Sequence, residues 1–279
     1  MDARQLHRGD MRKHGNNGVV PMSRERSLIL ASLIALAAAA WAILIWQSAV
    51  ANKEMTRMGA PLVLAIWVAT MVAMMFPTAA PMILMFTRVH AGKRQRGQSF
   101  VPTWVFVGSY LVVWVLFGAL AYAVAMGAEK LAQQSIWLMD NVARLGGGVL
   151  VLAGLYQLSP LKRSCLSKCR TPLDFILSSW RDGYVGSFRM GLEHGAYCLG
   201  CCWLLFVILF PLGVMNVAAM AVITLLIFAE KSLPVGQQIG QIAGVALMAY
   251  GALVVFVPGA LPTIIERQTE WQLVQAAPV

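Results

Sequence analysis

The chain has 279 residues, of which 59% are hydrophobic and only 12% are charged. Soluble domains contain about 25% charged residues, so this composition excludes a soluble globular protein and indicates that much of the chain faces lipid. The formal net charge is +10 at pH 7. Basic residues in short loops are typical of the cytoplasmic side of membrane proteins. Because no basic domain with interleaved aromatic residues is present, nucleic acid is not expected as a partner.

Residues 1–26 are polar and basic and predict a disordered cytoplasmic tail. Seven apolar stretches follow that are long enough to cross about 30 Å of hydrocarbon, at 27–50, 60–87, 101–127, 142–159, 192–213, 215–230 and 238–257. The connection between the fifth and sixth stretches is almost uncharged, so a single re-entrant hairpin is the alternative there. The sequence therefore predicts an all-α, polytopic transmembrane helical bundle over 27–258 and a short C-terminal tail, 259–279.

The distribution of basic residues predicts the orientation of this bundle. With the N-terminus inside, 17 of the 22 lysines and arginines lie on the cytoplasmic side and 5 on the other. This asymmetry agrees with the positive-inside rule. We therefore expect a multi-pass protein of the bacterial inner membrane with its N-terminus in the cytoplasm, and the lipid bilayer as its surroundings.

The longest predicted cytoplasmic loop, 160–191, contains a helix signal and two cysteines. Thr171 and Pro172 are typical of a helix start. Apolar residues follow at helical spacing and predict a short interfacial helix at 172–181 that lies along the leaflet: Leu173, Ile176, Leu177 and Trp180.

The fifth stretch carries residues with metal-ligand chemistry. His194, Cys198 and Cys202 recur every four residues, and Cys201 falls within the same sector of about 100° on a helix. Imidazole and thiolate are the ligands that Zn²⁺ and Cu(I) prefer. A single buried cysteine is usually a small packing residue, but four such groups on one helix face predict a metal site.

Cys165 and Cys169 are expected to complete this site from the loop. The cytoplasm is reducing, so free thiols or metal thiolates are expected there rather than a disulfide. Neighbouring basic residues should lower the pKa of these thiols, namely Lys162, Arg163, Lys168 and Arg170. Because His194 and Cys198 are predicted to begin the fifth span at the same face, we expect one shared site rather than two.

Methionines on the second stretch form a further candidate. Met71, Met74 and Met75, with Met82 and Met85, point within about 60° of one direction on an ideal helix. Thioethers select Cu(I) over Zn²⁺, although methionine is also a common packing residue. Pro77 and Pro81 interrupt the same helix and release the carbonyls of Ala73 and Pro77, which then need partners inside the protein.

Two carboxylates at membrane depth are candidates for a supporting role. Glu193 precedes His194 and is expected either to orient a metal ligand or to face the headgroups. Glu230 and Lys231 end the sixth stretch, where long side chains can reach the headgroups. Small-residue stripes at 236–244 and 146–154 predict helix-packing surfaces.

These motifs resemble those of a bacterial family of uncharacterised proteins described as predicted metal-binding integral membrane proteins. The similar segments are 71–77 with Pro81, 156–162 continuing to Cys165, Cys169, Arg170 and Pro172, 195–203, and Met215-Asn216 followed by Glu230-Lys231. The resemblance covers most of 27–258. It implies an integral membrane protein that binds a metal ion.

The residues favour a binding or transport protein over an enzyme. The leading hypothesis is that a soft metal ion, Cu(I) with Zn²⁺ as the alternative, is held or passed between the cytoplasmic thiol and imidazole groups and the methionine-lined helix. A metallochaperone or a membrane cuproenzyme would be its partner. Cys198 and Cys201 also form C-x-x-C, so a membrane thiol–disulfide oxidoreductase is the alternative function, and a purely structural scaffold is a third. The sequence has no phosphate-binding loop that would indicate an ATP-driven pump.

Overall fold

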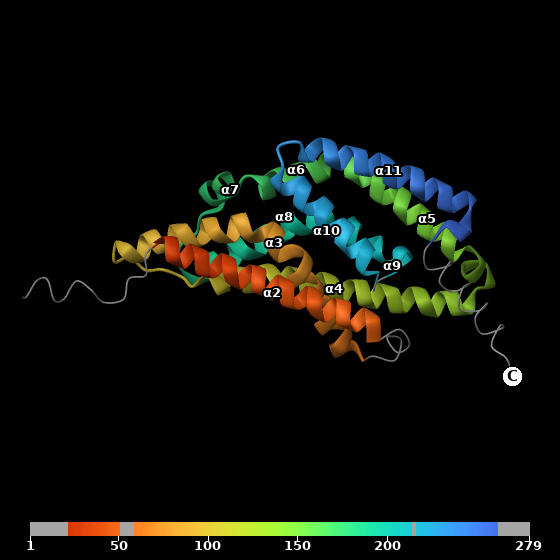
Figure 1. The fold of residues 1–279 in the computed structure, drawn as a ribbon, viewed down its shortest axis with the longest axis horizontal. Coiled ribbons are helices and arrows are strands. Elements are labelled where there is room, and N and C mark those ends of the chain that lie inside the picture. The colour runs from red at the N-terminus through yellow and green to blue at the C-terminus, as the bar shows by residue number, and fades with distance from the viewer. Residues whose placement is uncertain (1–21, 51–58, 214–215, 262–279) are drawn as a thin grey trace, which may run out of the picture.

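The computed structural model describes residues 22–50, 59–213 and 216–261. Within these ranges every regular element is helical, which confirms the predicted all-α bundle (Figure 1). In chain order the elements are α2 (Met22–Val50), α3 (Ala60–Gln95), α4 (Thr103–Gln134), α5 (Ile136–Leu158), α6 (Pro160–Arg170), α7 (Pro172–Ser179), α8 (Gly183–Val207), α9 (Leu209–Leu212), α10 (Val217–Ser232), α11 (Gly236–Phe256) and a short 3-10 turn, η2 (Pro258–Ala260).

Six helices in the described ranges are long and apolar enough to cross a membrane, namely α2, α3, α4, α5, α8 continued by α9, and α11. The remaining predicted span corresponds to α10, which has only 16 residues. At about 1.5 Å per residue it covers about 24 Å, less than the roughly 30 Å of a hydrocarbon core. Six of the seven predicted spans therefore have the length expected of a membrane helix.

The predicted tails lie mostly outside the described residues, which exclude 1–21 and 262–279. Helix α2 begins at Met22, so its first turn includes the last residues assigned to the basic tail.

The segment predicted as a loop at 160–191 is largely helical. Ser159 accepts a hydrogen bond from the backbone N–H of Lys162 at 3.2 Å, and Pro160 occupies the first helical position, so α6 begins there. The helix predicted at 172–181 is present as α7, Pro172–Ser179. Helix α8 begins at Gly183 rather than near residue 192, which places His194 well inside the helix instead of at its start.

Glycines allow two helices, α5 and α11, to pack backbone against backbone, and Figure 1 shows them side by side. A β-carbon at Gly154 would lie 2.5 Å from the carbonyl oxygen of Gly244, and one at Gly147 would lie 2.8 Å from that of Gly251. Both distances are too short for a real side chain. The predicted small-residue surfaces thus meet each other at these positions.

Helix α8 packs against α4 in the same way. A β-carbon at Gly191 would overlap Ser109, and one at Gly195 would lie 2.8 Å from Cγ2 of Val113. Because Gly191 and Gly195 flank His194, this close approach holds the histidine against α4.

The proline-containing part of α3 has the internal partner that the sequence requires. The indole N–H of Trp41, on α2, donates to the carbonyl oxygen of Ala73 at 3.1 Å. Pro77 has no backbone N–H to bond with that carbonyl. A side chain from the neighbouring helix therefore satisfies the group that the proline leaves free.

Several polar contacts gather the basic segments at one end of the bundle. Arg94, at the end of α3, donates to Glu25, near the start of α2, at 2.5 Å. Lys93 pairs with Asp182, which precedes α8. Arg170 donates to the carbonyl oxygen of Leu233, between α10 and α11, at 2.8 Å. The segments predicted to be cytoplasmic therefore share one end.

The α5–α11 contact generates a prediction about stability. Gly154→Ala should lower the melting temperature of the detergent-solubilised protein, because its β-carbon meets the backbone of α11. Gly148→Ala is the matched control on the same helix, since a β-carbon there has no neighbour within 4 Å. Alanine stabilises a helix by about 0.8–1.0 kcal/mol over glycine, so the control should melt at the same temperature or higher. Equal melting of the two variants would contradict the close packing.

Candidate metal site

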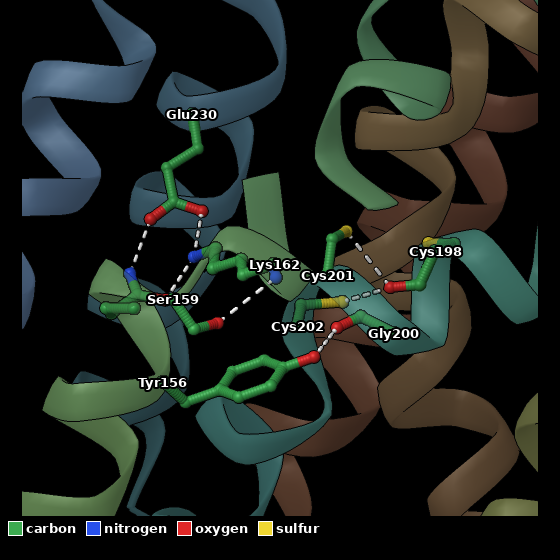
Figure 2. Close-up of polar contacts among 9 residues, drawn as sticks. Tyr156, Ser159, Lys162, Cys198, Gly200, Cys201, Cys202 and Glu230 are labelled. Atoms are coloured by element: carbon green, nitrogen blue, oxygen red, sulfur yellow. Dashed lines mark hydrogen bonds and ion pairs between the residues drawn. The ribbon is translucent and has the colours of Figure 1, made fainter. Parts of the chain in front are cut away.

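Four potential ligands of α8 lie on its buried side. His194, Cys198, Cys201 and Cys202 are each at most 2% exposed. The thiols of Cys201 and Cys202 donate to the carbonyl oxygen of Cys198 at 3.1 and 2.8 Å, as Figure 2 shows. Helical geometry thus collects three sulfur atoms and one imidazole within the core.

Helix α6 brings further thiols to the same place. The thiol of Cys169 is hydrogen-bonded to the sulfur atoms of both Cys198 and Cys201. The sulfur of Cys165 lies against Gly200, where an added β-carbon would be only 2.8 Å from it. All five cysteines are free thiols in the structure. The two groups of cysteines, separated in sequence by the whole of α7, are therefore neighbours in space.

The thiols of α6 differ from the expectation in their acidity. Hydrogen bonds to Cys198 and Cys201, followed by burial, raise the pKa of Cys169 well above its usual value. Burial raises the pKa of the Cys165 thiol as well. The prediction that nearby basic residues lower these pKa values is wrong because those side chains bind elsewhere. Lys162 pairs with Glu230, Lys168 with Asp174, and Arg163 and Arg170 donate to backbone carbonyls.

The cation that does contact the thiol cluster is Lys231, at the end of α10. Its side chain is buried, and Nζ lies 3.1 Å from the sulfur of Cys198. The hydroxyl of Tyr110, on α4, lies 3.2 Å from the same sulfur. The sequence signal for this contact was an ionisable residue at the end of an apolar helix. The direction in which that side chain points depends on how α10 packs.

Glu230 also faces the protein interior, and it anchors the cysteine-bearing helix. Its carboxylate accepts from Nζ of Lys162, on α6, at 2.6 Å, as Figure 2 shows, and from Nε2 of Gln157, on α5, at 2.5 Å. A β-carbon at Gly240 would lie 2.9 Å from the same carboxylate, so this glycine of α11 leaves room for it. Tyr156 adds a hydrogen bond from its hydroxyl to the carbonyl oxygen of Gly200 at 2.5 Å. These contacts fix α6 and α5 against α8 and α10.

Glu193 and His194 have different surroundings despite being adjacent. Glu193 accepts a hydrogen bond from Ser179 at 2.9 Å and so joins α7 to α8. The ring of His194 lies among Phe106, Tyr110 and Phe175, with ring centroids 5.4 to 5.9 Å away. Its Nδ1 is buried without a hydrogen-bond partner, so this nitrogen is available for a ligand.

The methionines of α3 lie in the core. Met71, Met74, Met75 and Met82 are fully buried, and Met85 is partly buried. Helix α3 packs against α2, α4 and α10. The stripe thus has the burial expected of packing residues, and its thioethers are shielded from water.

The thiol cluster is not arranged as a finished metal site. In the described residues no group of three or more His, Cys, Asp or Glu side chains has the geometry to hold a metal ion. The hydrogen bonds from Cys201 and Cys202 to the backbone turn their thiols toward a carbonyl oxygen. Small side-chain rotations would therefore accompany the binding of an ion.

The buried ion pair between α6 and α10 generates a second prediction. Glu230→Met should release α6, because it leaves the charge of Lys162 buried without a partner, which typically costs about 3–5 kcal/mol. The measurement is the rate at which a small maleimide labels Cys169 in protein whose other cysteines are replaced by serine. The double variant Lys162→Met/Glu230→Met should restore slow labelling, since apolar residues often replace a buried pair without loss. Fast labelling in both variants would show that the ion pair does not specifically hold α6.

Among known proteins, no curated protein and no solved structure matches the chain. A family model described as PpoB2, copper chaperone, matches residues 64–254, a range that contains all five cysteines, His194, Lys162, Glu230 and Lys231. Because the match covers more than half of the chain, the protein belongs to the PpoB2 family of copper chaperones.

Proposed function

We propose that the protein is a membrane-embedded chaperone that holds Cu(I) as its cargo between α6 and α8. The observation that carries this proposal is the meeting of Cys169, on α6, with Cys198 and Cys201, on α8, which brings three sulfur atoms from two helices together. The copper chaperone family supports the choice of metal. Thiolates are soft ligands that suit Cu(I).

Cys198 is the proposed central ligand, and Cys169 and Cys201 are the two thiols from which the second ligand is proposed to come. Cu(I) is stable with two or three sulfur ligands, whereas a structural Zn²⁺ site is almost always four-coordinate. Cys165, Cys202 and His194 lie around these three residues and are the proposed positions to which the ion moves during loading or release. The methionines Met71, Met74 and Met75, with Met82 and Met85, are the proposed soft ligands deeper in the bundle.

We place the site near the cytoplasmic side of a bacterial inner membrane, with the N-terminus inside. Support comes from the excess of basic residues in the segments that share one end of the bundle and from the six apolar helices. A cytoplasmic metallochaperone is the proposed donor and a membrane cuproenzyme the proposed acceptor. The family description points to copper and adds nothing to the thiol–disulfide oxidoreductase alternative.

Metal competition tests the proposed cargo. The purified protein should bind Cu(I) more tightly than Zn²⁺ when each competes with a calibrated chelator under reducing conditions. Cys198→Ser combined with Cys201→Ser should lose most of the Cu(I) binding, because the central proposed ligand and one of the two candidates for the second ligand are removed.

Single variants of α6 provide the matched control. Cys169→Ser should weaken Cu(I) binding, whereas Cys165→Ser, whose sulfur lies against Gly200, should retain most of it. Full Cu(I) binding by the Cys198/Cys201 double variant would remove α8 as the site.

The proposed orientation has a separate test. In a chain whose only cysteine is Cys165, a membrane-impermeant maleimide should label inverted vesicles and not intact spheroplasts. Gln134→Cys, at the exposed last residue of α4, should show the opposite pattern in an otherwise cysteine-free chain. Labelling of Cys165 from outside would reverse the topology.

A further inference from the structure

The hydrogen bonds around Cys198 distinguish its sulfur from the other four. Lys231 approaches it at 3.1 Å, and a lysine ammonium has three N–H donors and no acceptor, so the sulfur accepts. The Tyr110 hydroxyl and the Cys169 thiol are also hydrogen-bonded to this atom. Polar groups from α10, α4 and α6 therefore converge on one sulfur of α8, and the ammonium of Lys231 is the charged donor among them. Such a convergence is typical of a thiolate.

The buried ammonium of Lys231 requires a negatively charged partner. Its side chain is buried, with an exposed fraction of 9%, and a buried ammonium is costly unless a negative charge compensates it. The adjacent carboxylate, Glu230, is bound to Lys162 and Gln157 instead. None of the ion pairs found among the described residues includes Lys231. The sulfur of Cys198 is thus the group that faces the charge of Lys231.

The charge of a bound ion determines whether the metal–thiolate site still neutralises the ammonium of Lys231. Cu(I) held by two thiolates carries one net negative charge, which the ammonium of Lys231 neutralises. Zn²⁺ held by the same two thiolates is neutral, and it would leave the ammonium buried without a counter-charge. Net charge in an apolar interior is unfavourable, so the monovalent ion is preferred.

We propose that Lys231 is a specificity-determining residue that selects a monovalent soft cation, held by Cys198 and one further thiol, over a divalent one. This proposal rests on the proposed function. Binding of Cu(I) adds two copper–sulfur bonds and breaks one S–H bond, that of the second thiol, whose proton goes to solvent. Copper enters and remains as Cu(I), so no electron is transferred.

The test compares metal preference in charge variants of the full chain. Lys231→Met should lower the affinity for Cu(I) at least about tenfold, because the anionic copper site loses its buried counter-charge. Its affinity for Zn²⁺ should stay the same or rise. Lys231→Arg, which keeps the charge, should retain the preference of the wild type. Competition with calibrated chelators for each metal measures both affinities in the same preparation.

Two further variants separate charge from packing. Lys231→Gln keeps a hydrogen-bond donor without a charge and should lose the preference as Lys231→Met does, which also keeps the test decisive if the methionine variant does not fold. Lys93→Met removes a lysine that pairs with Asp182 instead of a thiol and should leave the preference for Cu(I) over Zn²⁺ unchanged. A parallel loss of both metals in Lys231→Met and Lys231→Gln would indicate a structural role and overturn the proposal.

The outcomes also separate this proposal from the function on which it rests. A wild-type chain that binds no Cu(I) would overturn both. A wild-type chain that prefers Cu(I), together with an unchanged preference in the uncharged variants, would overturn the role of Lys231 alone. X-ray absorption of the copper-loaded wild type should show copper bonded to two sulfur atoms, and a site of three or four sulfur atoms would contradict the charge balance.

Discussion

A lysine buried among apolar helices needs an opposite charge, and two such lysines determine how the cysteine-bearing helices meet. Lys162 of α6 faces the carboxylate of Glu230, and Lys231 of α10 faces the sulfur of Cys198. Because Glu230 and Lys231 are consecutive, they project from α10 about 100° apart and reach different neighbours. A displacement of α10 would break both contacts and leave two buried charges without partners, each costing several kcal/mol. The position of α10 is therefore coupled to the positions of α6 and α8.

Local patterns in the sequence predicted much of this arrangement. The four-residue spacing of His194, Cys198 and Cys202 defines a helix face whatever the rest of the chain does, and the structure buries that face. The glycines of α5 and α11 likewise marked surfaces of close approach. The helix at 160–170 was missed, although Ser159 and Pro160 form the same kind of start signal as Thr171 and Pro172. Its low hydropathy and basic residues favoured a loop interpretation. In the structure, the N-cap hydrogen bond to Ser159 and contacts with α8 stabilise a helix there.

The roles of Glu230 and Lys231 could not be predicted in this way, since both depend on tertiary contacts. At the end of an apolar helix, a long charged side chain can equally well extend to the headgroups or turn inward. Which occurs depends on whether a partner of opposite charge is within reach, and those partners, Lys162 and Cys198, lie far away in sequence. The sequence identified the right residues for scrutiny because ionisable groups at membrane depth are rarely accidental. The direction in which these two side chains point is visible only in the structure.

The incomplete geometry of the thiol cluster is consistent with a cargo site rather than a storage site. A chaperone must release its ion, and affinity falls when only a fraction of the molecules has its ligands in the binding arrangement. Here the thiols of Cys201 and Cys202 are hydrogen-bonded to the Cys198 carbonyl, so an ion that binds them must first displace those bonds. On the proposed function, this exchange weakens binding without removing any ligand. Cys165, half-buried on α6 with its sulfur beside Gly200 of α8, then provides a thiol through which an incoming or departing ion can pass by stepwise ligand exchange.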